Sequence, residues 1–331
     1  MKKILKIIFL ILIIVVLIFF IYFFIGKSKP AEKVEWGVTF SKRYAVDLGL
    51  DWQKTFLAIL DDLGAKKIRI IAYWDETESE KGKYNFADLD WQINEVEKRE
   101  GEIIFAVGRR MPHWPECFEP DWAKELSEKE KQERILVFIS ETVTRYKDRK
   151  SIKVWQVENE PFLRTFGKCP WPNIKFLDKE IALVRHLDNS RSIMITESGE
   201  FSTWIGGARR ADIIGTSLYR KVWSKTLGYL KYPIPPVFYQ RKANLIKFLF
   251  DLNEIIAIEV QAEPWGNRAT QNMTVDEQDI SMSFEQFNDV LEYTRKAGFD
   301  KAYLWGVEWW YWRKEKFGDD RFWERAKELF K

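Results

Sequence analysis

Four glutamates in two short stretches have the side chains that acid and base chemistry needs. Glu158 and Glu160 end an apolar run in "WQVENEPF", and Glu259 and Glu263 end a second run in "EIIAIEVQAE". Burying an ionised carboxylate is costly unless it is paired or used. Two carboxyl groups can cleave a glycosidic bond, because one protonates the leaving oxygen while the other attacks or stabilises the oxocarbenium-like carbon. The two stretches therefore predict a carboxylate-based site.

Histidine is too scarce for several other chemistries. His113 and His186 are the only two in the chain. A Ser-His-Asp relay or a multi-histidine metal site has little to draw on. A barrel that binds phosphate is also disfavoured. Such a barrel needs a Gly-rich loop after its seventh or eighth strand, and the corresponding loops here carry Trp instead. We expect neither a metal nor a cofactor.

The elements that must position these glutamates alternate along the chain. Short β-branched runs alternate with longer amphipathic stretches, a pattern typical of parallel strands with helical crossovers. The expected strands cover 34–41, 66–74, 102–110, 152–160, 192–200, 212–220, 254–263 and 301–310. Eight rounds predict an α/β fold, a (β/α)8 TIM barrel over 34–331. An open doubly wound sheet is the alternative, but its Gly-rich first turn is missing.

In such a barrel the chemistry lies at the carboxyl ends of the strands. Those ends are polar here, with Asp75, Arg109, Arg110, His113, Asn159, Glu160, Glu197, Tyr219, Glu259, Glu263 and Glu308. Alternation along a strand predicts that Glu158 and Glu160 share one face, as do Glu259 and Glu263. If Glu160 points inward, Glu259 can face it across the barrel mouth.

The amino terminus predicts a membrane segment. The run 7–26 is uncharged and apolar, long enough to cross a bilayer as a helix. We expect an anchor over 1–26 and a linker over 27–33, with a cleaved signal peptide as the alternative. Lysines flank the run on both sides; we favour a cytoplasmic amino terminus, which places the barrel outside the cytoplasm.

Charge and cysteine content limit the partners. Five of the 53 basic residues lie in the first thirty, so the remainder has 48 basic and 50 acidic side chains, no footprint for nucleic acid. Cys117 and Cys169 fit no zinc spacing; they could pair outside the cytoplasm or remain free thiols.

The two glutamate stretches together resemble clan A of the glycoside hydrolases, the retaining barrel enzymes that include families 5, 39 and 42. "WQVENEPF" is similar to the end of the clan's fourth strand, and "IAIEVQAEPW" to the end of its seventh. "RIIAYWDETESEKGKYNFADLDW" resembles the clan's second strand and the turn after it. The resemblance covers 36–312. The chain departs from the pattern at 77–81, where the usual Glu-Pro is missing.

The resemblance implies roles for the glutamates. Glu160 would be the acid/base, and Asn159 would hydrogen-bond the sugar 2-hydroxyl. Glu259 would be the nucleophile, with Glu263 as the alternative and otherwise a substrate-binding residue. Glu158 is expected to be a buried structural partner of a basic group.

Further residues match the clan's substrate-binding positions. Arg69 would hydrogen-bond the nucleophile, although a core ion pair would look the same in sequence. Tyr219 would orient the nucleophile, or else be a rim tyrosine. Trp305 resembles the aromatic residue under the cleaved sugar. Additional platforms or hydrogen bonds, or else core positions, are Trp74, His113, Trp114 and Trp265.

These features predict a monomeric, membrane-anchored retaining β-glycosidase. Its partners would be a poly- or oligosaccharide substrate and the lipid bilayer. A transglycosylase and a non-catalytic glycan-binding barrel are the alternatives, since both would keep the same cleft.

Overall fold

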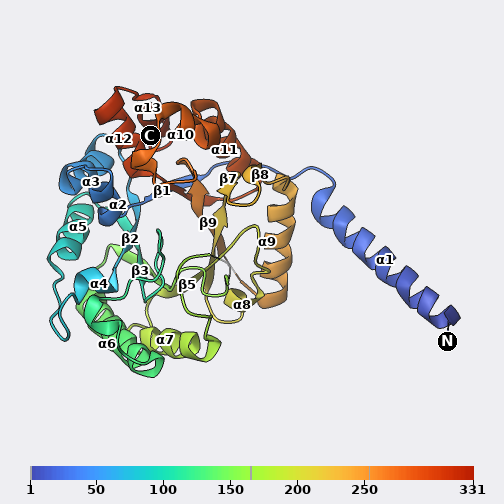
Figure 1. The fold of residues 1–331 in the computed structure, drawn as a ribbon, viewed down its shortest axis with the longest axis horizontal. Coiled ribbons are helices and arrows are strands. Elements are labelled where there is room, and N and C mark those ends of the chain that lie inside the picture. Colours follow the sequence, from blue (N-terminus) through green and yellow to red (C-terminus); the bar gives the residue numbers. More distant parts are fainter. Residues whose placement is uncertain (1, 165, 253) are drawn as a thin grey trace.

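The protein is described here by a computed structural model that covers residues 2–164, 166–252 and 254–331. Eight parallel strands close into a barrel in the order β1-β10-β9-β6-β5-β4-β3-β2 (Figure 1). The strands are β1 (Glu35–Thr39), β2 (Lys67–Ile71), β3 (Glu102–Val107), β4 (Ile152–Val157), β5 (Ser192–Glu197), β6 (Ile213–Leu218), β9 (Glu254–Gln261) and β10 (Lys301–Trp305). The predicted TIM barrel is confirmed.

Helices form the outer layer. Several begin at cap residues that the sequence supplies: Asp51 accepts bonds from the first turn of α3, and Ser127 and Ser283 form capping boxes at α6 and α11. The helices are α2 (Lys42–Asp47), α3 (Trp52–Asp61), α4 (Trp74–Thr77), α5 (Ala87–Lys98), α6 (Glu128–Tyr146), α7 (Ile174–Leu187), α8 (Ile205–Ala208), α9 (Pro236–Phe250), α10 (Val275–Met282), α11 (Phe284–Lys296), α12 (Val307–Phe317) and α13 (Arg321–Lys327).

The lower part of the barrel interior is filled with side chains. This layer consists of Ile104, Val154, Met194, Ile213, Ile256, Ile258 and Tyr303. A Cβ on Gly37 would lie 2.6 Å from the Tyr303 ring and 2.7 Å from the Lys67 carbonyl, so glycine is needed for this tyrosine to fit. The closed interior leaves the mouth above this layer as the place for a site.

Two of the strands end earlier than expected. In each, the chain stops pairing with the neighbouring strands and turns into a helix. Trp74 lies in α4 and not at the end of β2, and Glu308 lies in the first turn of α12 and not in β10. The hairpin of β7 (Lys221–Ser224) and β8 (Gly228–Lys231) follows β6 and was not anticipated. Its strands have four residues each, too few for a clear period.

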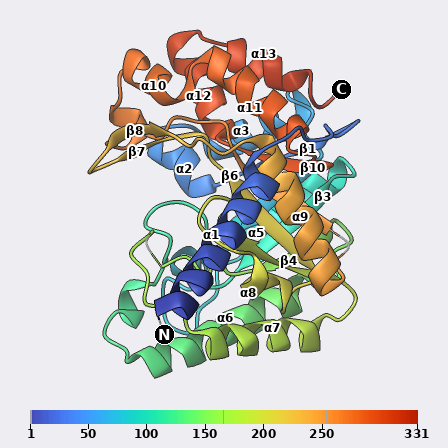
Figure 2. The same cartoon turned by 90° about the vertical axis from the view of Figure 1, so that its right-hand side faces the viewer.

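The amino-terminal helix α1 (Lys2–Phe24) projects from the barrel on the side that α9 covers (Figures 1 and 2). By length and composition it could cross a membrane, a test that a signal sequence also passes. Its last turn packs on α9: the Phe23 and Phe24 rings lie 5.8 and 5.2 Å from the Phe238 ring.

Candidate active site

A fully buried arginine organises the mouth of the barrel. Arg69 Nη1 donates to Glu259 Oε1 at 2.6 Å, Nε donates to Gln156 Oε1 at 2.8 Å, and Nη2 donates to Asn159 Oδ1 at 2.9 Å. One guanidinium therefore joins β2, β9 and the end of β4. Charge-assisted bonds of this kind are strong and fix geometry.

The inward direction of Glu259 depends on an irregularity in β9. Thr216 pairs with Ala257 while Ser217 pairs with Glu259, so Ile258 is an extra residue. A bulge of this type breaks the alternation. Ile258 then lies in the interior layer, and the next residue, Glu259, also points inward to Arg69. Simple alternation would place Ala257 and Glu259 on one face, but Ala257 packs in the core outside the barrel while Glu259 faces the mouth.

Glu160 lies beyond the end of β4 in a left-handed conformation, with φ of 43°. Its N–H donates to Thr196 Oγ1 at 2.7 Å, and the Thr196 hydroxyl donates to Asn159 Oδ1 at 3.1 Å. Burial raises the pKa of Glu160 well above its usual range, and the nearby Glu259 carboxylate raises it further. Glu160 therefore favours the protonated form beside a carboxylate that Arg69 pairs.

Asn159 is buried in the same network. Its Oδ1 accepts from Arg69 and Thr196, so its amide NH2 group is left to donate to a ligand. This is the group that could bind a sugar hydroxyl.

Glu158 and Glu160 do not point the same way. Glu158 has a left-handed φ of 59°, which ends the two-residue alternation of the strand before Glu160 is reached. Its carboxylate accepts the backbone N–H groups of Arg109 at 2.8 Å and Arg110 at 2.7 Å. Gly108 permits this approach, since a Cβ there would lie 2.6 Å from Glu158 Oε1. Among the described residues, its hydrogen-bond donors are thus backbone amides, and it forms no ion pair with the basic side chain that we expected.

Glu263 lies beside the aromatic wall. The Trp305 indole N–H donates to Glu263 Oε1 at 2.7 Å, and Oε2 has no hydrogen-bond partner among the described residues. Burial raises the pKa of Glu263 to about 7. No Arg or Lys pairs with this carboxyl in the described part of the chain, which distinguishes it from Glu259.

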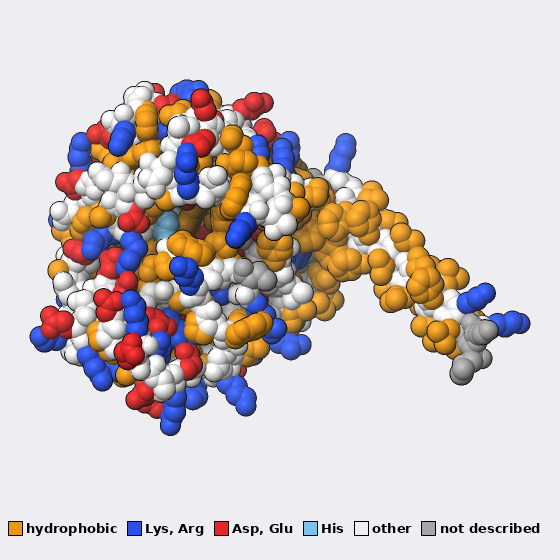
Figure 3. Space-filling model, in the orientation of Figure 1, with side chains coloured by type: hydrophobic (Ala, Val, Ile, Leu, Met, Phe, Trp, Pro, Cys, Tyr) orange, Lys and Arg blue, Asp and Glu red, His pale blue; other side chains and the backbone are white. Residues whose placement is uncertain are grey.

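His113 and Trp305 form the wall next to Glu263. The His113 ring lies 4.2 Å from the Trp305 ring and 4.8 Å from the Tyr44 ring. Burial and the nearby Arg69 charge lower the pKa of His113 to about 3, so the imidazole is neutral at ordinary pH. Figure 3 shows this side of the molecule, with a histidine visible in the hollowed centre.

A second aromatic group lies between the chain segments that follow β3, β4, β6 and β9. The Trp265 ring is 5.1 Å from Tyr219 and 5.3 Å from Phe166, which is 5.9 Å from Trp114. Burial and the nearby Glu259 raise the pKa of Tyr219 well above its usual range. Among the described residues, its hydroxyl makes no hydrogen bond to Glu259, so its orienting role stays a prediction.

Trp74 is separate from these groups. It is fully buried against Trp122 and Phe138 and donates its indole N–H to Glu78. It has no exposed surface for a ligand, and we assign it to the core.

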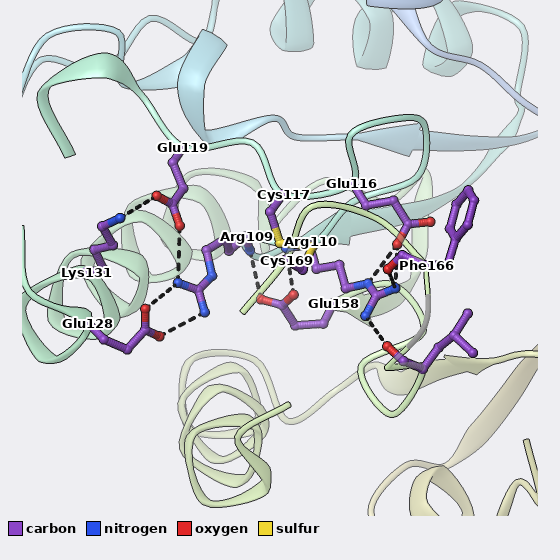
Figure 4. The surroundings of a disulfide bond; sticks show 11 residues. Arg109, Arg110, Glu116, Cys117, Glu119, Glu128, Lys131, Glu158, Phe166 and Cys169 are labelled. Carbon is purple, nitrogen blue, oxygen red and sulfur yellow. Dashed lines mark hydrogen bonds and ion pairs between the residues drawn. A yellow bond between two sulfur atoms is a disulfide. The ribbon is translucent and has the colours of Figure 1, made fainter. Parts of the chain in front are cut away.

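The loops after β3 and β4 are joined beside the site. Cys117 and Cys169 form a disulfide, which settles the pairing that the sequence left open. Arg110 donates to the carbonyls of Leu163 and Phe166 and pairs with Glu116 at 2.6 Å (Figure 4). These contacts hold the loop that follows Glu160.

Two carboxyl groups at the mouth were missed from the sequence. Glu116 and Glu200 both raise the pKa of Glu160. Glu200 accepts from the Tyr219 N–H and the Tyr239 hydroxyl, both at 2.8 Å. The sequence did hold one indication of Glu200, because this residue ends the fifth expected strand, 192–200. Glu197, expected at that end, instead accepts the Gly207 N–H and lies away from the mouth.

Comparisons with known proteins agree with the barrel. No family model matches the sequence, and no curated protein matches it. A β-galactosidase from the Antarctic haloarchaeon Halorubrum lacusprofundi is similar over 90% of this chain and 57% of its own, with 12% identity and a TM-score of 0.57. GH5_18 from Streptomyces cattleya, in complex with GlcNAc, is similar over 83% of this chain and 71% of its own, with 13% identity and a TM-score of 0.56.

A GH5_18 variant from Bifidobacterium longum, in complex with Manb1-4GlcNAc, is similar over 82% of this chain and 68% of its own, with 14% identity and a TM-score of 0.57. This chain thus spans little more than half the length of the β-galactosidase. At such low identity these likenesses show the fold, a closed (β/α)8 barrel.

Proposed function

We propose that this chain is a retaining β-glycosidase of clan A of the glycoside hydrolases. The observation that carries the proposal is the buried Arg69–Glu259 contact of 2.6 Å beside the desolvated Glu160. The environments favour one ionised and one protonated carboxyl group, the combination that double displacement requires. The similar structures include a β-galactosidase and complexes with GlcNAc-containing sugars, which suits a carbohydrate substrate.

The proposed reaction has two steps. Glu259 attacks the anomeric carbon while Glu160 gives its proton to the leaving glycosidic oxygen, so the C–O bond breaks and a glycosyl ester forms. Water then attacks the same carbon, Glu160 takes its proton, and Glu259 is released as carboxylate. Asn159 would bind the sugar 2-hydroxyl, while Trp305, His113 and Trp265 would contact the sugar rings.

The test is an assay of the full chain on a panel of aryl glycosides and oligosaccharides. Glu160→Gln and Glu259→Gln should each abolish turnover in a folded protein. Glu254→Gln, at the other end of β9, is the matched control and should keep activity. Azide should rescue Glu259→Ala as a glycosyl azide. Full activity of either active-site variant, or a first product of inverted configuration, would reject the mechanism.

We further propose that α1 anchors the barrel outside the cytoplasm. The apolar run supports a membrane span, and the Cys117–Cys169 disulfide suits an oxidising compartment. Retention of the full chain in membranes after alkaline carbonate washing tests the anchor, and release into the supernatant would contradict it.

A further inference from the structure

The outer surface of α9 is unusually apolar. Leu245, Phe248 and Leu249 expose 36%, 84% and 56% of their surface. Among the described residues, each of the other helices around the barrel exposes at most one large apolar side chain to this extent. Scattered single exposures are ordinary, whereas a cluster usually marks a contact surface.

The cluster continues a contact that the structure already contains. Helical spacing places Phe238 and Arg241 on the same side of α9 as Leu245 and Phe248. Phe238 packs on Phe23 and Phe24 of α1. Arg241 donates to the carbonyls of Tyr22 and Ile25, at the end of α1. The exposed stripe therefore begins where α1 leaves the barrel.

The segment after α1 is held on the barrel and does not behave as a free tether. The Lys29 N–H donates to Gln240 Oε1 at 2.9 Å, and Gln240 Nε2 donates to the Lys29 carbonyl at 2.6 Å. The Ala31 N–H donates to the Arg295 carbonyl at 2.9 Å. These bonds fix how the barrel is oriented relative to α1. The side covered by α9 is the side from which α1 departs (Figures 1 and 2).

We propose that the stripe Leu245, Phe248 and Leu249 is a membrane-contact surface that inserts into the headgroup boundary of the bilayer that α1 spans. The proposal rests on the proposed anchor. Arg241 lies on the same side of α9 as the stripe, and long basic side chains can keep their charges among headgroups while apolar neighbours insert. The hollow of the barrel opens toward the viewer in Figure 3 while α1 leaves to one side, so the mouth would stay open beside the membrane.

The test uses the full chain in vesicles of equimolar phosphatidylcholine and phosphatidylglycerol that contain nitroxide-labelled lipid. Single cysteines at Phe248→Cys, Leu12→Cys and Val46→Cys carry an environment-sensitive fluorophore. The two native cysteines are paired, so only the introduced thiol reacts without reductant. Leu12 lies in α1, and Val46 is an exposed apolar residue on α2, across the barrel from α9 (Figure 1).

We expect strong quenching at position 12, and at position 248 at least about threefold more quenching than at position 46. Quenching at 12 with equal, weak values at 248 and 46 would overturn the α9 contact and leave the anchor intact. Weak quenching at all three positions would reject the anchor and the contact together.

A second variant tests the stripe without changing the labelled residue. A label at Leu245→Cys should lose most of its quenching when Phe248→Asp and Leu249→Asp are added, because inserting two carboxylates into the boundary is unfavourable. Val46→Asp in the same labelled background is the control and should change nothing. Unchanged quenching in the double variant would contradict the proposal.

Discussion

The ends of β4 and β9 each carry two glutamates, and at each end the two have different surroundings. Glu158 accepts hydrogen bonds from two backbone N–H groups, and Glu259 accepts one from the Arg69 guanidinium. Burial raises the pKa of Glu160 and of Glu263, and neither pairs with a basic side chain among the described residues. The comparison teaches that the burial and the hydrogen-bond donors around a carboxyl group, and not its residue type, decide what that group can do.

The largest expected effect separates the two glutamates of β9. Glu259→Gln should lower kcat/KM on the order of ten thousandfold or more, because the attacking carboxylate is lost. Glu263→Gln keeps an acceptor for the Trp305 N–H and should cost about ten- to a hundredfold, mainly in KM. Steady-state kinetics of both variants measure this, and the reverse ranking would make Glu263 the nucleophile.

The next effect concerns the donor that Glu259 depends on. Arg69→Lys keeps the positive charge but cannot reach Glu259, Gln156 and Asn159 together. We expect kcat/KM to fall about a hundredfold and the free energy of unfolding to fall by about 3 kcal/mol. Arg295→Lys, in the exposed Arg295–Glu292 ion pair of α11, is the control and should change either value little. Equal effects of the two changes would show that the buried network is dispensable.

A smaller effect should separate the two glutamates of β4 by stability. Glu158→Gln places an amide NH2 group against one of two backbone donors, so we expect a loss of about 1–3 kcal/mol in the free energy of unfolding. Glu160→Gln removes a poorly solvated carboxyl group and should be neutral or stabilising by up to about 1 kcal/mol. Denaturant unfolding of both variants gives the comparison, and similar losses would remove the distinction between these glutamates.

The smallest effect is electrostatic. The negative charge of Glu259 helps to raise the pKa of Glu160, so Glu259→Gln should lower that pKa. Carbon-13 NMR titration of the Glu160 carboxyl group in the parent protein and in the variant measures the change. In the active enzyme, deprotonation of Glu160 should give the alkaline limb of the kcat/KM profile, since the acid is lost as pH rises. An unchanged Glu160 pKa in the variant would mean that the two carboxyl groups do not interact.

The sequence by itself determined the eight strands and their order along the chain. Each β-branched run and each amphipathic stretch is a local pattern that can be recognised without knowing its partners in space. It also identified Arg69, Asn159, Glu160, Glu259 and Glu263 as side chains at the strand ends, which the structure brings to one mouth. It indicated the long apolar segment as well, since hydropathy needs no partner strand.

Only the tertiary structure decided which way those side chains point. The bulge at Ile258 turns Glu259 inward, and left-handed residues end the alternation at Glu158 and Glu160. The Cys117–Cys169 bond, the placement of Trp74 in the core and the contact of α1 with α9 were likewise open in the sequence. The physical reason is that register, bulges and docking depend on partners far away along the chain, whose positions no local pattern encodes.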